Sequence, residues 1–485
     1  MAEKTKNTSA AYMLHCAIGI FFMFGFGALP PFGPVTVLGM KVLGIFIGCI
    51  YLWTVVDILW PSLLGLVALA LSGYAPAGQI MAGAFGDSVT VLVLFGMILF
   101  GAIQNAGVTE HISRWFLTRR IINGRPLIFS FAFIYCTYIL AALSASILPS
   151  ILFMWAILYG VLRDVGYKKG DKYTTLMVIG TYFGAMVGHC AKPFVATGLI
   201  LTGAFTSVSG MEINYLAFML FGFVMATLSV LIYCLLMKYL FKPDMSKIAS
   251  ISTEHFERDK LPPMDSAQKI LFVCLFAFLL LMLAPSILPK TWAFVIVLNK
   301  IGNTGIAVLF VAALCLFHID KKPIMNFKDV INRYVAWDVY FLVAMVMVIS
   351  NALTAESTGI TEFLTQLLAP ALGGKSPYVF AVILLTFSIV VTNFANNTVV
   401  GVMLMPVIFS FAMQNGGNVL AIVTTVIFML HYAIVTPAAS IYSSVLHGNS
   451  DWVESKEVAR YSSVVMLFML VLFILVGLPL ANLLF

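Results

Sequence analysis

Residues 127–162 read LIFSFAFIYCTYILAALSASILPSILFMWAILYGVL, and residues 376–413 read SPYVFAVILLTFSIVVTNFANNTVVGVMLMPVIFSFAM. Neither stretch contains a charged residue, and each is too long for one straight membrane crossing of about 20 residues. Each fits the two limbs of a re-entrant hairpin, although two full crossings would also suit the first stretch. A short polar triplet lies near the middle of each stretch, where the tip of a hairpin would be: Ser144-Ala145-Ser146 and Asn396-Asn397-Thr398.

The composition of the whole 485-residue chain is that of a membrane protein, with 10% charged and 61% hydrophobic residues. A soluble domain carries about 25% charged residues, so a soluble enzyme, a nucleic-acid-binding module and a disordered protein are all excluded. The net charge of +7 comes from basic residues that flank apolar spans and form no nucleic-acid patch. Apolar stretches longer than about 18 residues recur along the chain, whereas the alternating segments of a membrane β-barrel are absent.

These features predict an all-α polytopic membrane protein with about 11 transmembrane helices and two re-entrant hairpins. The predicted spans are 11–28, 36–58, 60–74, 88–106, 174–206, 214–240, 268–289, 302–317, 338–356, 418–446 and 459–485.

The basic residues predict the orientation in the membrane. Arginines and lysines lie at both ends of the first hairpin stretch, at 114–125 and 163–172, whereas only Lys375 is near the second. Cytoplasmic loops are enriched in Lys and Arg, so the first hairpin should enter from the cytoplasm and the second from outside. The chain is then expected in the plasma (bacterial inner) membrane, with a cytoplasmic N-terminus and an external C-terminus. Lys41 and Lys192 fall inside membrane segments.

The two halves of the chain repeat each other. Residues 107–112 (GVTEHI) match residues 359–364 (GITEFL), and the same offset of 252 residues superposes the two polar triplets. Each half also has a Pro-containing polar break further on, at 189–193 and at 435–440. Inverted repeats with broken helices are typical of secondary transporters, although polar residues at helix contacts are the alternative. The predicted divisions are an N-terminal helix (1–35), a first repeat (36–240), a cytoplasmic linker (241–267) and a second repeat (268–485).

No motif of an enzyme or of a cofactor site is present. We find no P-loop, zinc motif, nucleophile elbow or dinucleotide fingerprint, so neither an enzyme nor ATP-driven transport by this chain is expected. The seven cysteines are scattered through apolar spans without a C-x-x-C pair, which favours small buried residues over metal ligands or disulfides.

The second tip, residues 392–398 (TNFANNT), and the segments AFGD at 84–87 and WD at 337–338 resemble the divalent anion/sodium symporter family. This family contains di- and tricarboxylate carriers of the wider ion-transporter superfamily, and the resemblance covers roughly residues 38–485. It implies an elevator-type carrier, usually a homodimer, in which a hairpin-bearing domain moves the substrate past a scaffold domain.

The resemblance also implies the site residues, since family members carry a Ser-Asn-Thr triplet at each tip. At the first tip Ala145 replaces the Asn, and Leu140 stands where the family has a further hydroxyl, so we predict that the first sodium site is absent. The second tip keeps Thr392, Ala395 and Asn397, which match the second cation site, so at most one sodium ion is expected. The predicted substrate-binding residues are Ser144, Ala145, Ser146, Lys192, Asn396, Asn397, Thr398, Thr436 and Pro437.

Lys192 lies in the first break, inside an apolar span. An intramembrane lysine costs ~2.5–3.5 kcal/mol or more unless it faces a cavity or a partner. Our hypothesis is that its ammonium replaces the lost sodium as a fixed cation; pairing with a buried carboxylate and snorkelling are the alternatives. His189 and His431, beside the two breaks, are candidate proton sites because histidine titrates near physiological pH, with a satisfied structural role as the alternative.

Together these features predict a secondary active transporter of small organic anions, with di- or tricarboxylates as the first choice. Helix N-termini at hairpin tips bind carboxylates, and small tip side chains let an anion approach the backbone. Sodium-independent anion exchange, or transport of a sulfonate, an aminobenzoyl-type acid or arsenite, are variants, and an ion channel is the alternative from another class. Apart from one sodium ion no cofactor is expected, and the partners are the anion, the bilayer and a second copy of the chain.

Overall fold

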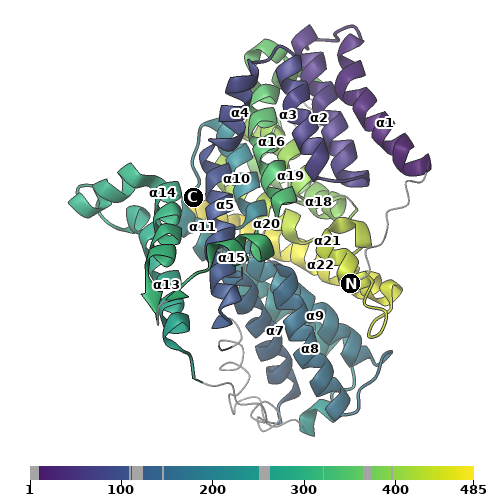
Figure 1. Ribbon diagram of the computed structural model, residues 1–485. Coiled ribbons are helices and arrows are strands. Elements are labelled where there is room, and N and C mark those ends of the chain that lie inside the picture. Colours follow the sequence, from purple (N-terminus) through teal and green to yellow (C-terminus); the bar gives the residue numbers. More distant parts are fainter. Residues whose placement is uncertain are drawn as a thin grey trace.

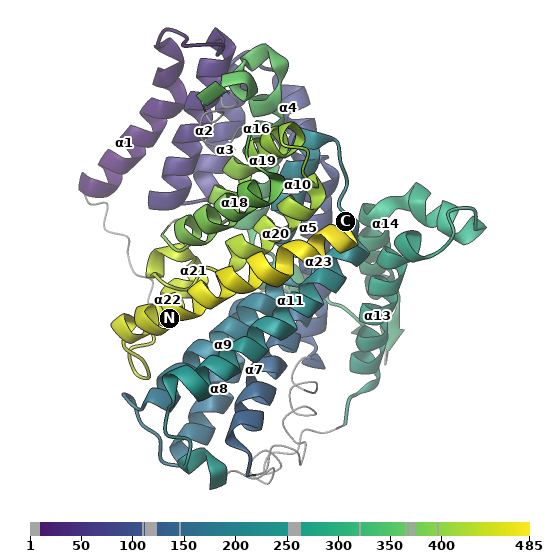
Figure 2. The ribbon, with the colours of Figure 1, turned by 180° about the vertical axis from the view of Figure 1, so that it is seen from behind.

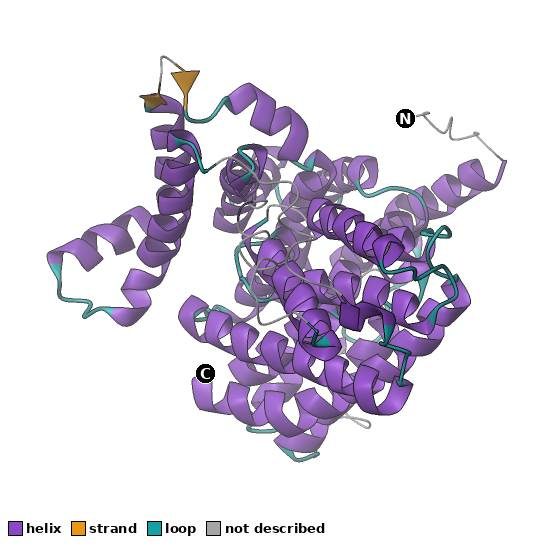
Figure 3. Ribbon diagram, turned by 90° about the horizontal axis from the view of Figure 1, so that it is seen from below, coloured by secondary structure: helices purple, strands orange, loops and turns teal. Residues whose placement is uncertain are grey.

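The computed structural model describes residues 10–108, 111, 124–144, 147–250, 263–319, 322–363, 366–367, 374–394 and 397–485. The described chain is almost entirely helical (Figure 3), and its described strands, β1 (His318–Ile319) and β2 (Lys322–Pro323), form one short antiparallel pair. By length and composition, 10 of the described helices could cross a membrane. The prediction of an all-α polytopic membrane protein is therefore confirmed.

The helices before the first hairpin agree with the predicted spans. Two of them begin at side-chain caps: the Thr36 hydroxyl accepts a backbone N–H at the start of α2, and the Asp87 carboxylate accepts two at the start of α5. Asp87 belongs to the AFGD segment that carries part of the family resemblance. These elements are α1 (Ala10–Gly25), η1 (Phe26–Ala28), α2 (Val37–Val55), α3 (Leu59–Leu71), α4 (Ala77–Phe85) and α5 (Ser88–Asn105).

Each predicted hairpin stretch forms two helices joined at a short tip. The outer ends of both hairpins begin with a proline at the first helical turn, Pro126 and Pro377, where the missing N–H would have had no partner in the helix. The limbs are α7 (Pro126–Leu143) and α8 (Ile147–Asp164) in the first hairpin, and α18 (Pro377–Thr392) and α19 (Asn397–Gln414) in the second.

Each Pro-containing segment interrupts a helix, so the predicted spans 174–206 and 418–446 are each two helices joined by irregular backbone. The first break separates α9 (Lys172–Cys190) from α10 (Ala196–Ser209), and the second separates α20 (Val419–His431) from α21 (Ile441–His447). The turn η6 (Pro437–Ala439) lies within the second break. Irregular backbone persists at membrane depth only where it is buried in protein or lines a cavity, which marks both breaks as candidate functional segments.

The remaining helices complete the bundle. The predicted span 302–317 matches the part of α14 that follows a kink at Gly302, whose φ of 68° interrupts the helical backbone, and the part of α14 that begins at Ala293 precedes this kink. The remaining elements are α11 (Tyr215–Leu236), η3 (Met237–Phe241), η4 (Lys247–Ser250), α13 (Ser266–Ile287), α14 (Ala293–Leu316), α15 (Phe327–Tyr334), α16 (Trp337–Thr354), η5 (Glu356–Thr358), α22 (Ser455–Leu472), η7 (Phe473–Gly477) and α23 (Leu478–Leu484).

The helices divide into a central body with peripheral pairs. In Figure 1, α13 and α14 stand at one side of the molecule and α1 at the opposite edge, while α7, α8 and α9 lie together at one end. Figure 2 shows α22 and α23 running obliquely across the back of this body. The two breaks lie inside the central body, because α9 and α10 pack against α20 and α10 also packs against α19.

A stripe of three glycines on α9 holds the first hairpin in place. Gly180, Gly184 and Gly188 are spaced four residues apart, so they share one face of the helix. A Cβ atom at Gly184 would lie 2.4 Å from the Ile134 carbonyl oxygen of α7, and one at Gly188 would lie 2.1 Å from the Tyr138 carbonyl oxygen. Glycine therefore lets the backbones of α7 and α9 touch, and this contact places the first tip beside the first break.

The loops that follow α8 and η3, both predicted to be cytoplasmic, lie against each other. The Lys247 ammonium pairs with the Asp171 carboxylate at 3.3 Å and donates to the Gly166 carbonyl at 3.0 Å. The Tyr167 hydroxyl donates to the Asp244 carbonyl at 2.8 Å, and burial raises the pKa of Tyr167 to about 12, so the hydroxyl keeps its proton at neutral pH. The two loops thus share one face, as the basic-residue argument requires; which side of the membrane that face meets remains a prediction.

Candidate functional site

The first hairpin tip is tied to the first break by Lys192. The chain leaves α7 at Ser144, whose hydroxyl donates to the Leu140 carbonyl at 2.7 Å and lies 2.8 Å from the Ser150 hydroxyl of α8. The Lys192 ammonium donates to the Ser144 carbonyl at 2.5 Å, and the Lys192 side chain is only 4% exposed. The structure therefore brings together two residues, 48 positions apart, that the sequence predicted to share a site.

An aromatic ring covers the other side of this ammonium. Its nitrogen lies 4.2 Å from the ring centroid of Phe100 on α5, a cation–π distance. Phe100 in turn packs edge-on against Phe278 of α13, which also contacts Phe194 of the first break. The ammonium is thus held between a tip carbonyl and a ring face, away from water.

Lys192 has no acidic partner in the described part of the chain. The buried groups with basic side chains there are Lys192, His189, His431 and His447, and no described Asp or Glu is buried with them. Pairing with a buried carboxylate, one alternative for Lys192, is therefore not seen. Snorkelling is not seen either, because the ammonium is directed at the Ser144 carbonyl and the Phe100 ring.

The second hairpin tip is tied to the second break by neutral groups centred on Asn393, the C-cap residue that follows α18. Its amide nitrogen donates to the Tyr432 carbonyl at 3.0 Å, and its amide oxygen accepts the backbone N–H groups of Ile434 and Val435 at 2.9 and 2.8 Å. The Thr436 hydroxyl donates to the Asn393 carbonyl at 2.5 Å. One buried side chain thereby satisfies three backbone groups in the first part of the break.

The sequence reasoning did not select Asn393 as a site residue, although it quoted the segment that contains it. The available signal was an amide side chain with no ionic role inside an apolar hairpin, only a few residues before the polar triplet. A buried amide must find hydrogen-bond partners, and an irregular helix break offers many. That partnership joins residues about 40 positions apart, so only the folded chain shows it.

The described residues of the predicted cation site surround the same tip. Thr392 ends α18 and donates its hydroxyl to the Leu430 carbonyl at 2.7 Å. Asn397 begins α19, and its side-chain oxygen accepts the Thr398 N–H at 2.9 Å. Thr436 is half-buried in the break, whereas Pro437 is exposed at the start of η6. Four further predicted site residues lie outside the described residues: Ala145, Ser146, Ala395 and Asn396.

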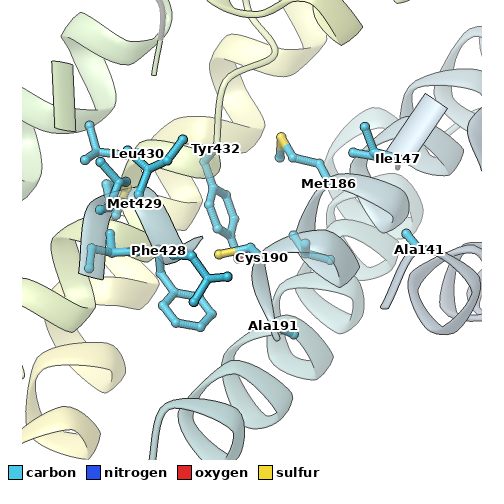
Figure 4. Close-up of a cluster of buried hydrophobic side chains, with 14 of the residues drawn as sticks. Ala141, Ile147, Met186, Cys190, Ala191, Phe428, Met429, Leu430 and Tyr432 are labelled. Atoms are coloured by element: carbon cyan, nitrogen blue, oxygen red, sulfur yellow. The ribbon is translucent and has the colours of Figure 1, made fainter. Parts of the chain in front are cut away.

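The two breaks are joined to each other. The Tyr182 hydroxyl of α9 donates to the Ala433 carbonyl of the second break at 3.2 Å and lies 3.3 Å from the Ser440 hydroxyl. Figure 4 shows the apolar contact between them: the end of α20 and Tyr432 face the end of α9, with Ala141 and Ile147 of the first hairpin beyond. The two tips and the two breaks therefore form one connected region at the centre of the protein.

His189 and His431 occupy corresponding places, at the ends of α9 and α20 beside the two breaks. Both are buried, and His189 lies within electrostatic range of His431 and of Lys192. His447 differs, because both of its ring nitrogens have partners, the Ser455 hydroxyl at 2.7 Å and the Ile434 carbonyl at 3.1 Å. His447 is therefore a satisfied structural histidine.

Comparison with known proteins agrees with this picture of hairpin tips meeting helix breaks. The sequence profile of the sodium:sulfate symporter transmembrane region matches residues 10–485. The sodium-dependent dicarboxylate transporter SdcS of Staphylococcus saprophyticus is 23% identical over 463 residues, which are 89% of this chain and 85% of that protein. The solved structure of the Alcanivorax borkumensis YdaH transporter shares the fold, with a TM-score of 0.52, 14% identity and coverage of 84% of this chain and 86% of that one.

The profile match extends over nearly the whole chain, so the resemblance inferred from the tip residues is confirmed. The proteins it resembles are transporters, which agrees with the expectation that this chain is not an enzyme. The chain belongs to the sodium:sulfate symporter family of membrane transporters.

Proposed function

We propose that this protein is a secondary active carrier of small organic anions, with di- or tricarboxylates as the first choice, and that Lys192 supplies a fixed positive charge to the anion site. The observation that carries the proposal is the Lys192 ammonium, which is buried, has no acidic partner among the described residues and is bonded to the carbonyl of the first tip. A buried ammonium is costly unless an opposite charge joins it, so the site favours an anion. The name of the relative SdcS points to dicarboxylates.

The same contact supports the absence of a sodium ion at the first tip. A sodium ion there would need several oxygen ligands, but Leu140 has no side-chain oxygen and the Ser144 carbonyl is already engaged by the ammonium. The ammonium thus makes the contact with the tip that a cation would make. A charge that belongs to the protein need not be taken up in each transport cycle, which lowers the number of co-transported cations.

At the second tip we propose at most one co-transported sodium ion, held by Thr392, Ala395 and Asn397. The Thr392 hydroxyl gives its hydrogen to the Leu430 carbonyl, which leaves its oxygen lone pairs free for a cation. The Asn393 network keeps the backbone of this tip and of the facing break in one arrangement. A helix N-terminus begins at each tip, at Ile147 and Asn397, and would accept the carboxylates of the substrate.

The transport cycle we propose is of the elevator type, in a homodimer in the plasma membrane with a cytoplasmic N-terminus. Sodium-independent exchange of one anion for another is the nearest variant, because a fixed cation removes one need for a co-transported ion. A sulfonate, an aminobenzoyl-type acid or arsenite would use the same cationic site. An ion channel is the alternative from another class and would give single-channel currents without counterflow.

The test is uptake of labelled succinate into proteoliposomes, with and without an inward sodium gradient and with unlabelled succinate inside. We expect Lys192→Met to lower uptake about 30-fold or more, since losing one partner of a desolvated ion pair costs about 2–5 kcal/mol. Lys192→Arg should keep part of the activity. Lys41→Met is the matched control, because Lys41 also lies in an apolar helix and donates to a carbonyl, that of Ser72, but is exposed.

Normal uptake by the Lys192→Met variant would refute the role of the fixed cation. A Hill coefficient for sodium well above one would refute the limit of one sodium ion. Stimulation by internal succinate without any response to sodium would select the exchanger over the symporter.

A further inference from the structure

The two breaks place two imidazole rings close together in the centre of the protein. His189 lies in the last turn of α9 and His431 is the last residue of α20, so each ends the first half of a broken helix. Their exposed fractions are 8% and 6%, and each is close enough to the other for an electrostatic interaction. The two halves of the chain thus contribute one titratable group each to the same interior region.

Each ring has a nitrogen that finds no partner among the described residues. The Nδ1 atom of His431 lies 2.7 Å from the Ile427 carbonyl oxygen, which can only accept, so Nδ1 carries the hydrogen. In the neutral ring Nε2 is then a bare lone pair, and it is buried without a described donor. Nδ1 of His189 is likewise buried and unpartnered. Buried polar atoms are normally paired, so an unpaired ring nitrogen is a candidate binding site for a proton or a ligand.

The titratable groups around this pair are basic or neutral. Lys192 lies within electrostatic range of His189. The other buried titratable groups described on the packed elements are Tyr173, Tyr182 and Cys190 of α9, Cys136 and Tyr138 of α7, Tyr233 and Cys234 of α11, Tyr461 of α22, and Tyr432 after α20. None of these residues carries a carboxylate.

The charged groups on neighbouring helices are distant from the pair. Glu457 of α22 accepts from Thr175, 14 residues before His189 and therefore about 20 Å away along α9. Arg163 stands at the far end of α8, against the ring of Trp452. No described carboxylate therefore stabilises a proton on the histidines, and the positive Lys192 opposes one while the anion site is empty.

We propose that His189 and His431 together bind one proton when the dianion binds, and that this proton crosses the membrane with the substrate. A dianion leaves one negative charge uncompensated beside Lys192, and the lone pair on His431 Nε2 or His189 Nδ1 takes up a proton from the entry side. Lys192, the protonated pair and the dianion then sum to zero charge. Release of the anion on the other side restores the repulsion from Lys192 and expels the proton. This inference rests on the proposed anion site.

The charge balance explains why a proton suits this chain. Moving uncompensated charge through a low-dielectric interior is costly, so a neutral load crosses more readily. In sodium-free medium, the second positive charge must come from another source. The histidine pair lies beside both breaks, and histidine is the side chain whose unperturbed pKa is nearest to physiological pH, so the pair is the candidate source of that charge.

The experiment uses sodium-free proteoliposomes at about pH 7 outside and about pH 8 inside, where succinate is fully ionised on both sides. We expect the alkaline interior to accelerate labelled succinate uptake about tenfold, and an enclosed pH dye to report acidification when succinate is added. The variant carrying His189→Gln and His431→Gln should lose this acceleration and the dye signal. Succinate counterflow at equal pH should persist at a reduced rate, because exchange needs no net proton movement but the load then carries one uncompensated negative charge. His318→Gln is the matched control, an exposed histidine in β1.

The outcomes separate this inference from the proposed function. Wild-type protein that exchanges succinate without a dye signal overturns the proton site and leaves the anion carrier standing. Wild-type protein that neither exchanges nor accumulates succinate overturns the dicarboxylate carrier itself. A dye signal that survives in the double variant shows that the proton binds elsewhere. If the double variant fails to fold, the dye and uptake measurements on the wild-type protein still test the proton site and the dicarboxylate carrier. The His431→Gln variant alone then tests whether the proton binds elsewhere.

Discussion

Both hairpin tips are bonded to the helix break that faces them, the first through a charged side chain and the second through neutral side chains. In each half, one side chain of the break donates to a carbonyl of the facing tip: Lys192 to Ser144 in the first half, and Thr436 to Asn393 in the second. The first donor is a long cation and the second is a short neutral hydroxyl. The second tip needs the additional Asn393 amide to satisfy its break, whereas the first has the Phe100 ring beside its ammonium.

The two tips differ in whether their polar groups are balanced within the protein itself. A neutral network such as that of Asn393 is stable in the empty protein, because every member finds a partner within the fold. A lone buried ammonium is not balanced in this way and depends on a ligand for its counter-charge. The two hairpins thus offer two corresponding positions, and we propose that the neutral one serves structure and the charged one serves the anion.

The largest effect we expect is from Asn393→Ala, which tests whether the second tip depends on this one side chain. It would leave the Tyr432 carbonyl and the N–H groups of Ile434 and Val435 without partners, at a cost of about 3–5 kcal/mol in the free energy of unfolding. Chemical unfolding in detergent measures it. Asn482→Ala is the control, since that amide bonds only to a carbonyl of its own helix; equal stability of the two variants would contradict the network.

The next effect tests how the first tip is held, through the glycine stripe of α9. Gly184→Ala places a methyl group 2.4 Å from the Ile134 carbonyl oxygen, so α7 must shift away, and we expect a loss of about 1–3 kcal/mol. Gly160→Ala on α8 is the matched control, because nothing lies within 4 Å of its Cβ position. There the greater helix propensity of alanine should stabilise by roughly 0.5–1 kcal/mol. A stable Gly184→Ala protein would show that α7 and α9 do not touch.

A smaller effect is expected from Phe100→Leu, which tests the environment of the fixed cation. Removing the ring face costs the ammonium about 0.5–2 kcal/mol of cation–π interaction, so its position loosens and the apparent affinity for succinate should fall about 2- to 30-fold. Any sodium response should stay unchanged, because the second tip is untouched. Phe223→Leu, an exposed position on α11, serves as control. A change in sodium dependence without a change in affinity would contradict the division between the tips.

The smallest effect is expected from Thr436→Val, the neutral counterpart of the Lys192 substitutions. The variant loses one hydroxyl donor to the Asn393 carbonyl, which should cost about 1 kcal/mol of stability and less than about tenfold in uptake. Thr54→Val is the control, since that exposed hydroxyl bonds only to Ile50 in its own helix. If Thr436→Val abolished uptake as completely as Lys192→Met, the contrast between a neutral tip and a charged tip would be lost.

Much of the architecture could be predicted from local sequence. The uncharged stretches at 127–162 and 376–413 are too long for one span, and the structure resolves each into two helices. The Pro-containing segments predicted the breaks for the same local reason, since a proline and polar neighbours interrupt a helix wherever they occur. Lys192 was conspicuous because an unpaired charge in an apolar span needs an explanation. The predicted span that begins at residue 302 did not include the first part of α14, Ala293–Ile301. This part is separated from the rest of the helix by a kink at Gly302, and hydropathy does not show such a kink.

The sequence by itself determined that this chain is a polytopic helical membrane protein with two hairpins, two breaks and one anomalous lysine. These properties depend on hydropathy, length and charge, which act locally and survive in a single sequence. The tertiary structure decided which groups meet: the Lys192 ammonium with the Ser144 carbonyl, and Asn393 with the second break. It also brought His189 close to His431. The hydrogen bonds join residues separated by about 40 to 50 positions, and the electrostatic neighbours His189 and His431 are about 240 positions apart, so only the packing of helices over close glycine contacts brings these groups together.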